Sequence, residues 1–144
     1  MSLLAIVCLL WAGMVLGISF LEAPVKFTTP SLTLQVGLDV GRHVFAAFHK
    51  VEILWAVLSL VLLWRVPLPR AAQFALGAAL IVLLAQSVWL LPILDARVSL
   101  ILDGKQPPSA PYHVIYVLLE AVKLIGLLVC GVLCMNGLKA IPHG

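Results

Sequence analysis

Four long apolar runs, separated by polar or proline-containing segments, dominate the pattern of the chain. They cover residues 3–21, 44–64, 71–94 and 113–135. A helix needs about 20 apolar residues to cross the hydrocarbon core of a bilayer, so each run is long enough for one span. Backbone groups must be paired inside lipid, and the connecting segments are too short for a barrel, so the pattern predicts helices. We expect an all-α polytopic membrane protein, a single antiparallel four-helix transmembrane bundle over residues 1–144.

Prolines and short polar segments set the predicted ends of the spans. The first run ends at Glu22 and Pro24, because proline removes a helical hydrogen bond. The short loop over residues 65–70, with its two prolines, returns the third run beside the second. Residues 22–43 allow two interpretations: the apolar–polar alternation is typical of an extended chain, and the same stretch could form an interfacial helix leading into the second span.

The composition agrees with a membrane location and excludes several classes of protein. Hydrophobic residues make up 63% of the chain and charged residues 10%, whereas soluble domains are about 45 to 50% apolar. The net charge of +3 comes without any run of Lys or Arg, which argues against a nucleic-acid partner and favours anchoring to the lipid bilayer. Cys8, Cys130 and Cys134 lie in apolar runs without paired spacing, so we expect packing roles, with soft-metal ligation as the alternative.

The fourth apolar run carries a stripe of polar side chains. His113, Tyr116, Glu120 and Lys123 follow one another at spacings of three and four residues, which places them on one face of a helix. A charged group at bilayer depth costs at least about 2.5 to 3.5 kcal/mol, so such residues normally face the bundle interior and pair. We therefore expect this face to point inward.

The second run carries a matching stripe. Asp39, Arg42, His49 and Glu52 fall on one side of a continuous helix. The second and fourth runs begin on the same side of the predicted bundle, so their polar stripes can meet. Glu22, at the end of the first run, reaches the same side. The sequence therefore predicts a polar half of the bundle.

Three functions fit this polar half, and the sequence leaves open whether the protein is an enzyme. The first is a polar intramembrane site between the second and fourth helices that binds or transports a small compound or ion. The second is a membrane redox protein in which His49 and His113 bind haem or copper. The third is a structural subunit of a membrane complex, whose ion pairs fix the helix register. The candidate ligand or ion residues are Glu52, Glu120, Lys123, His49, His113, Tyr116 and Glu22.

Gly13 and Gly17 form a GxxxG pair in the first run, which permits close approach of two helices. The partner helix could belong to the same chain. It could also belong to a second copy or to another subunit of a membrane complex.

Scattered landmark residues give the chain a resemblance to a known group of proteins. They are Gly17, Phe20, Pro24, Val25, Phe27, Gly41, Phe45 and Phe48 in the first half and Pro92, Arg97 and His113 in the second. This pattern resembles small four-helix membrane domains of unknown function that are widespread in bacteria, although His49 stands where such proteins often have proline. Related four-helix families are linked to anthrone oxygenation or copper handling. The resemblance implies a four-helix membrane fold, metal or redox chemistry as a possible activity, and a bacterial inner (plasma) membrane location.

Overall fold

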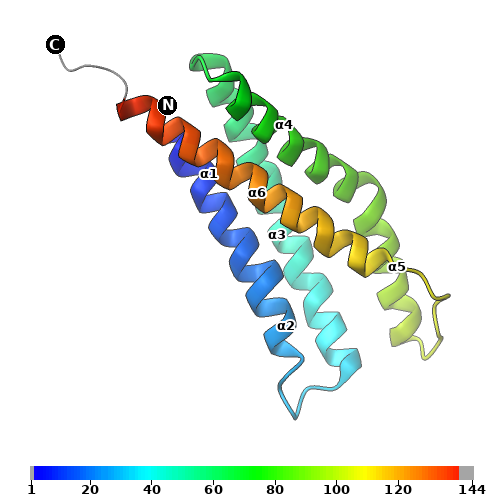
Figure 1. The fold of residues 1–144 in the computed structure, drawn as a ribbon. Coiled ribbons are helices and arrows are strands. Elements are labelled where there is room, and N and C mark those ends of the chain that lie inside the picture. Colours follow the sequence, from blue (N-terminus) through cyan, green and yellow to red (C-terminus); the bar gives the residue numbers. More distant parts are fainter. Residues whose placement is uncertain (1, 140–144) are drawn as a thin grey trace.

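In the computed structural model, which describes residues 2–139, the chain forms four long helical segments (Figure 1). They are α1 (Ser2–Val15) continued by the π-helical η1 (Leu16–Glu22) and α2 (Ala23–Lys26); α3 (Leu34–Arg65); α4 (Arg70–Ala85) continued by the π-helical η2 (Gln86–Leu90) and α5 (Leu91–Leu102); and α6 (Tyr112–Lys139). All four are long and apolar enough to cross a membrane. The predicted all-helical class and the four spans are confirmed at this level.

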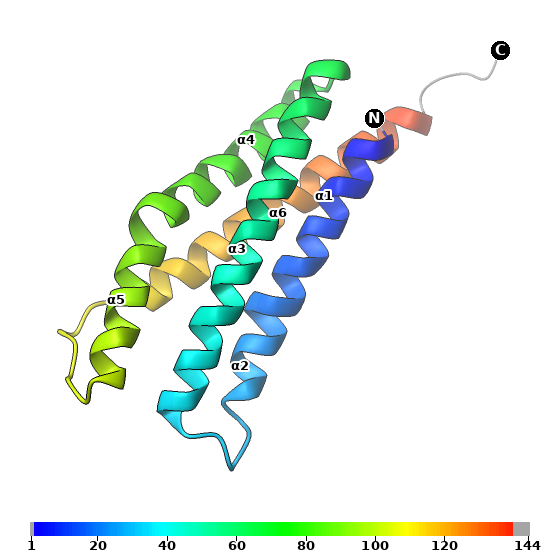
Figure 2. The same ribbon diagram turned by 180° about the vertical axis from the view of Figure 1, so that it is seen from behind.

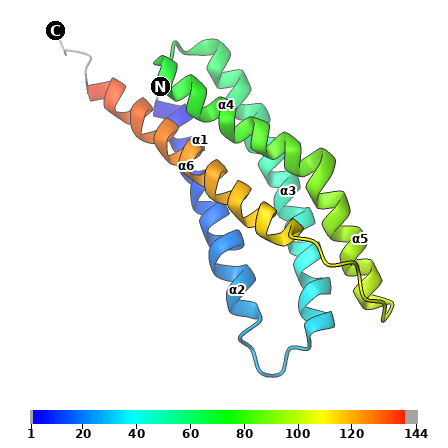
Figure 3. The same ribbon diagram turned by 45° about the vertical axis from the view of Figure 1, so that its right-hand side comes forward.

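The two ends of the bundle differ in what they contain. The start of α1, the turn over residues 66–69 and the end of α6 lie together at one end, here called the turn end (Figures 1 and 2). The connections over residues 27–33 and 103–111 lie at the other, here called the loop end. α6 packs mainly against α1 and α4, while α3 packs against α1 and α5. In Figure 3, α6 accordingly crosses in front of α3, which lies diagonally opposite.

Two prolines lie inside long helical segments, although Pro24 was expected to end the first span. Pro24 continues the first helical segment to Lys26, and Pro92 lies in a helix that runs on to Leu102. Each proline follows a π-helical segment by two residues. A proline lacks the N–H for an α-helical bond and its ring crowds the carbonyl four residues earlier, and the wider π turn relieves both problems. The predicted ends at residues 21 and 94 are therefore too early.

The second helix begins ten residues before the predicted start. Thr33 has an extended backbone, and its side chain accepts a hydrogen bond from the Val36 N–H at 3.3 Å, so it caps a helix that begins at Leu34. The extended-chain interpretation is wrong for residues 34–43. Gly37 and Gly41, one helical turn apart, lie directly against the Phe27 ring and the Lys26 ammonium group. These contacts join α2 to the start of α3.

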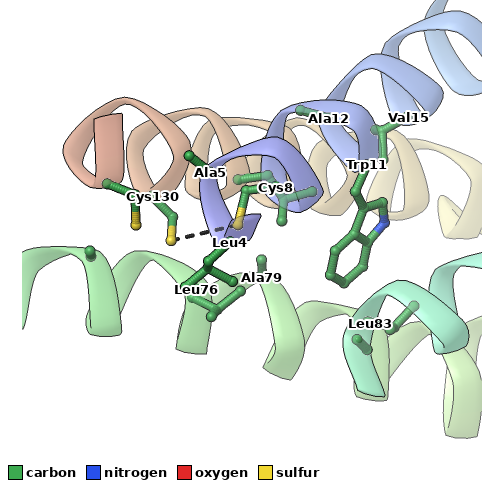
Figure 4. Packing of buried hydrophobic residues seen from close by; sticks show 14 of the residues in the cluster. Leu4, Ala5, Cys8, Trp11, Ala12, Val15, Leu76, Ala79, Leu83 and Cys130 are labelled. Atoms are coloured by element: carbon green, nitrogen blue, oxygen red, sulfur yellow. Dashed lines mark hydrogen bonds between the residues drawn. The ribbon is translucent and has the colours of Figure 1, made fainter. Parts of the chain in front are cut away.

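Apolar side chains fill the interior near the turn end, and others cover the outside. Figure 4 shows Leu4, Cys8, Trp11 and Leu76 packed together between α1, α4 and α6. Many large apolar side chains point outward instead, and Trp64 is 94% exposed. A soluble monomer rarely exposes so continuous an apolar surface. The surface therefore fits lipid better than water.

The closest backbone approach in the bundle occurs on α6. A Cβ atom added at Gly126 would lie 2.7 Å from the backbone oxygen of Ala75, and one added at Gly131 would lie 2.8 Å from the Leu9 side chain. At Gly13 and Gly17, an added Cβ would meet nothing within 4 Å. The idea that this GxxxG pair packs inside the monomer is therefore wrong. Contact with a second chain or a complex partner through Gly13 and Gly17 stays a prediction.

These contacts predict opposite effects of the same substitution. Gly126→Ala should lower the free energy of unfolding by about 1 to 3 kcal/mol, because the new methyl group meets a backbone oxygen that cannot rotate away. Gly13→Ala should be neutral or stabilising by up to about 1 kcal/mol, because alanine favours the helix and the space is open. Thermal unfolding of both variants in the same detergent measures the difference. Equal melting temperatures would contradict the α4–α6 contact.

Candidate functional site

The ammonium group of Lys123, in the middle of α6, is completely buried and bound by three acceptors. Its Nζ lies 2.5 Å from Glu52 Oε1, 2.7 Å from Glu120 Oε1 and 2.8 Å from Gln86 Oε1. The ammonium group donates a hydrogen bond to Gln86 Oε1 and forms ion pairs with the two carboxylates. These four residues, each at most 1% exposed, are called the ionic centre below. They come from α3, η2 and α6, and the long Lys123 side chain bridges the diagonal between α6 and α3.

Both π-helical segments supply a donor to Glu120. Ser19 in η1 donates from Oγ to Glu120 Oε2 at 2.7 Å, and Gln86 in η2 donates from Nε2 to Glu120 Oε1 at 2.8 Å. The Gln86 amide thus accepts from Lys123 with its oxygen and donates to Glu120 with its nitrogen. π-Helical turns occur frequently at functional sites. Here they place two polar side chains on one carboxylate in the interior.

Glu52 has a less complete set of partners. Trp11 donates its indole N–H to Glu52 Oε1 at 3.1 Å, the same oxygen that faces Lys123. The ring of His49 lies on the side of Oε2, with its Nδ1 3.8 Å from this oxygen. That distance is too long for a hydrogen bond, and His49 Nδ1 is a buried atom without a hydrogen-bond partner among residues 2–139. The other ring nitrogen, Nε2, lies 2.9 Å from Ser87 Oγ.

The ionic centre carries more negative than positive charge. Glu52 and Glu120 are opposed by the one ammonium group of Lys123, so the centre has a net charge of −1 when the His49 ring is neutral. The three charged side chains are almost completely shielded from the surface. Burying an uncompensated charge is costly, and bound cations or protons relieve that cost. The geometry therefore favours uptake of one positive charge.

A second polar group joins α3 to α5 nearer the loop end. Arg42 pairs with Asp39 at 3.0 Å, lies 4.0 Å from Asp95 and donates to Ser99 Oγ at 3.2 Å. These side chains are partly exposed, so their ion pairs contribute little to stability. They fix the position of α5 relative to the start of α3.

The structure brings together only part of the predicted site. Glu52, Glu120 and Lys123 meet in the centre, and His49 borders it. Tyr116 is buried, with its ring edge-on to that of Phe45 at a centroid distance of 5.6 Å.

Glu22 and His113 lie elsewhere. Glu22 pairs with Lys26 at 3.3 Å near the end of the first helical segment. His113 is exposed at the start of α6 and makes no hydrogen bond or ion pair within the described part of the chain. Nothing in the geometry assigns either residue to the ionic centre.

The proposed metal ligands receive no geometric support. Among residues 2–139, no group of three or more His, Cys, Asp and Glu side chains is placed to hold a metal ion. His49 is mostly buried, whereas His113 is exposed. Cys8 and Cys130 are in contact, with their sulfur atoms 3.7 Å apart, inside the apolar cluster of Figure 4. These surroundings do not fit a two-histidine haem or copper centre, so metal binding stays a prediction without a site.

Four residues of the site were not singled out from the sequence: Trp11, Ser19, Gln86 and Ser87. Ser19, Gln86 and Ser87 are isolated polar residues inside long apolar runs, and polar side chains at that depth need internal partners. This signal could have identified three of them. Trp11 resembles any aromatic residue of a span, and its role depends on an indole N–H whose direction only the packing decides.

The ionic centre predicts that replacing Lys123 destabilises the protein far more than replacing Lys50. Lys123→Met should lower the free energy of unfolding by about 3 to 5 kcal/mol, because it leaves two buried carboxylates without their cation. Lys50→Met, on the exposed face of α3, should change it by less than about 0.5 kcal/mol. Thermal unfolding and folded yield in detergent measure both. Adding Glu52→Gln and Glu120→Gln to Lys123→Met should restore much of the yield; failure to do so would refute the charge argument.

Comparisons with protein-family models, with curated proteins and with solved structures each gave no match for this chain. The resemblance to small four-helix membrane domains therefore stays a prediction.

Proposed function

We propose that this protein is an integral membrane protein, an antiparallel transmembrane bundle whose ionic centre binds a small cation. Four apolar helices of sufficient length and the outward-facing apolar side chains support the membrane location. The single observation that carries the cation site is the buried net charge of −1 formed by Glu52, Glu120 and Lys123. One bound positive charge makes the centre neutral, which is the favourable state in an apolar interior.

The packing of the centre limits the size of what it binds. The contacts between its polar atoms measure 2.5 to 2.8 Å, and its side chains are at most 2% exposed. A proton or a bare monovalent cation fits such a place with small shifts of the carboxylates. An apolar groove of about 260 Å³ lies on the outer face of α6 along Leu128, Val129, Val132 and Leu133. That groove contains no charged group and belongs to the lipid-facing surface.

Within residues 2–139, most polar side chains near the centre lie on its loop-end side. Ser19, His49 and Ser87 surround it, and Glu22 and Lys26 follow farther along the same direction. Toward the turn end, the interior is mainly apolar, with Cys8, Leu76 and Leu127 among its residues, and it contains one uncharged polar side chain of α3, Ser59. A cation therefore reaches the centre from the loop end. The apolar half of the bundle separates it from the other face of the membrane.

A structural role remains the second candidate, because one observation favours it. Lys123 donates to Gln86 and forms ion pairs with both carboxylates, and buried ion pairs can fix helix register without binding anything. The two roles differ in what happens when the excess charge is removed. A purely structural network loses stability when a carboxylate is neutralised, whereas a cation site loses its response to the cation.

The proposed topology predicts the accessibility of single cysteines. In a background with Cys8, Cys130 and Cys134 replaced by Ala, a cysteine at Pro69 should be labelled from one side of the membrane. Cysteines at Thr29 and Lys105 should be labelled from the other, because they lie at the loop end. A membrane-impermeant maleimide applied to intact cells and to inverted vesicles measures this. Labelling of Pro69 and Thr29 positions from the same side would contradict the arrangement.

The cation site predicts a stability response that one carboxylate controls. At a cation concentration about ten times the dissociation constant, the melting temperature in detergent should rise by at least about 3 °C, since binding to the folded state adds about 1.4 kcal/mol. Li⁺, Na⁺ and K⁺ are tested against choline at constant ionic strength, and protons between pH 9 and pH 5.

The matched variants are Glu52→Gln, which removes the excess charge, and Glu22→Gln, which lies outside the centre. Glu52→Gln should fold and lose the response, and Glu22→Gln should keep it. If the wild-type protein responds to none of these cations, or if Glu52→Gln keeps the full response, the proposed function is wrong.

A further inference from the structure

We infer that the cation is a proton, held between Nδ1 of His49 and Oε2 of Glu52. This inference rests on the proposed function and names both the ion and the two atoms that hold it. The two atoms are 3.8 Å apart, and within the described residues no other group donates a hydrogen bond to either of them. Bringing a hydrogen between them turns an open contact into a charge-assisted hydrogen bond.

The contacts of Ser87 determine which form the His49 ring takes. Ser87 Oγ donates its one hydrogen to the backbone oxygen of Leu83 at 2.7 Å. With that hydrogen on the Leu83 oxygen, the hydroxyl oxygen accepts towards His49 Nε2, 2.9 Å away. In this arrangement Nε2 carries a hydrogen. In the neutral ring, Nδ1 then has a lone pair and no hydrogen.

This neutral form places two acceptors opposite each other. The lone pair of His49 Nδ1 faces Glu52 Oε2, and the hydrogen bonds of Glu52 from Trp11 and Lys123 both go to Oε1. Lys123 is already engaged, because its Nζ donates to Gln86 and forms ion pairs with Oε1 of Glu52 and Oε1 of Glu120. A hydronium ion transfers its proton to the Nδ1 lone pair, so that one N–H bond forms, one O–H bond of the hydronium ion breaks, and a water molecule is left. The charge of the centre with His49 changes from −1 to zero.

The groups around His49 leave no other source of positive charge. α3 contributes Glu52 and the exposed Lys50, α6 contributes Glu120, Tyr116 and Lys123, and η2 contributes the uncharged Ser87 and Gln86. α1 contributes the uncharged Trp11. Lys123 is shared between two carboxylates and neutralises one of them. His49 is therefore the group that can neutralise the other.

His49 also lies where water can reach it. Its side chain is 16% exposed, whereas Glu52 beneath it is 2% exposed and Lys123 is not exposed at all. Along α3, His49 is nearer than Glu52 to the loop end, where the polar residues are. The proton enters through His49 and stops at Glu52. Beyond Glu52 the interior contains no charged side chain among the described residues; it is mainly apolar, with the uncharged Ser59 on α3.

Nitrogen NMR of the ring tests the proposal directly. Full-length protein labelled with ¹⁵N-histidine is titrated in detergent from pH 9 to pH 5 in choline chloride, and the His49 signals are assigned by their loss in His49→Gln. At high pH the ring should be the tautomer with hydrogen on Nε2, and it should take up a proton on Nδ1 within this range. A ring that stays neutral down to pH 5, or that carries its hydrogen on Nδ1 at high pH, overturns the inference.

Two variants separate this site from a purely structural one. Glu52→Gln should lower the proton affinity of the His49 ring at least about tenfold, the lower end of the effect of an opposite charge at this distance. Ser87→Ala removes the acceptor for Nε2, so the neutral ring should move its hydrogen to Nδ1 and donate to Glu52 without taking up a proton. A merely structural contact would leave the tautomer unchanged. An unchanged proton affinity in Glu52→Gln also overturns the inference.

The outcomes distinguish this inference from the function on which it rests. If Na⁺ or K⁺ stabilises the protein while the His49 ring stays neutral, the centre binds a cation and the proton assignment is wrong. If neither metal ions nor protons stabilise the protein, both statements are wrong. Both measurements are made on the wild-type protein, and the His49→Gln variant serves only to assign the ring signals.

Discussion

The ammonium group of Lys123 is the constraint around which the bundle is arranged. A cation in an apolar interior is tolerated only with excellent geometry and complete hydrogen bonding, and here three acceptors from three different helical segments supply it. Satisfying it requires α3, η2 and α6 to present Glu52, Gln86 and Glu120 at the same depth. Because two carboxylates are used to satisfy one ammonium group, the same solution creates an excess of negative charge. The structural requirement and the proposed binding property therefore have one cause.

The fold could be predicted from the sequence to the level of four helices and no further. Runs of about 20 apolar residues identify the spans, because the thickness of the hydrocarbon core is fixed. The ends of the helices could not be predicted, since Pro24 was taken as a helix breaker and, like Pro92, lies within a continuous helix behind a π-helical turn. Whether a proline breaks a helix depends on the hydrogen bonds available to the turn before it. That is a property of the packed bundle, not of the residue type.

The ionic centre could be predicted only in its charged part. Spacing on a helix places Glu120 and Lys123 on one face, and the cost of lipid exposure turns that face inward. The spacing of the charged residues does not indicate which uncharged groups complete the centre, and Gln86 and Ser19 were missed for that reason. Glu22 was included because it lies at the correct end of its span, yet it has its own partner in Lys26. The depth of a residue in a span can be predicted from the sequence. The rotation of each helix about its own axis can be predicted only in part.

The π-helical segment η2 changes which side of the third helical segment faces its neighbours. A π turn contains one residue more than the α-helical turn it replaces, so everything after it is rotated by about 100° relative to an unbroken helix. Gln86, before this extra residue, faces the ionic centre, and Ser99, after it, faces Arg42 of α3. Both contacts can exist together only because the phase of the helix changes between them. The third helical segment thus consists of two straight parts, α4 and α5, that are rotated relative to each other about the helix axis. The one additional residue of the π turn determines which side of α5 contacts α3.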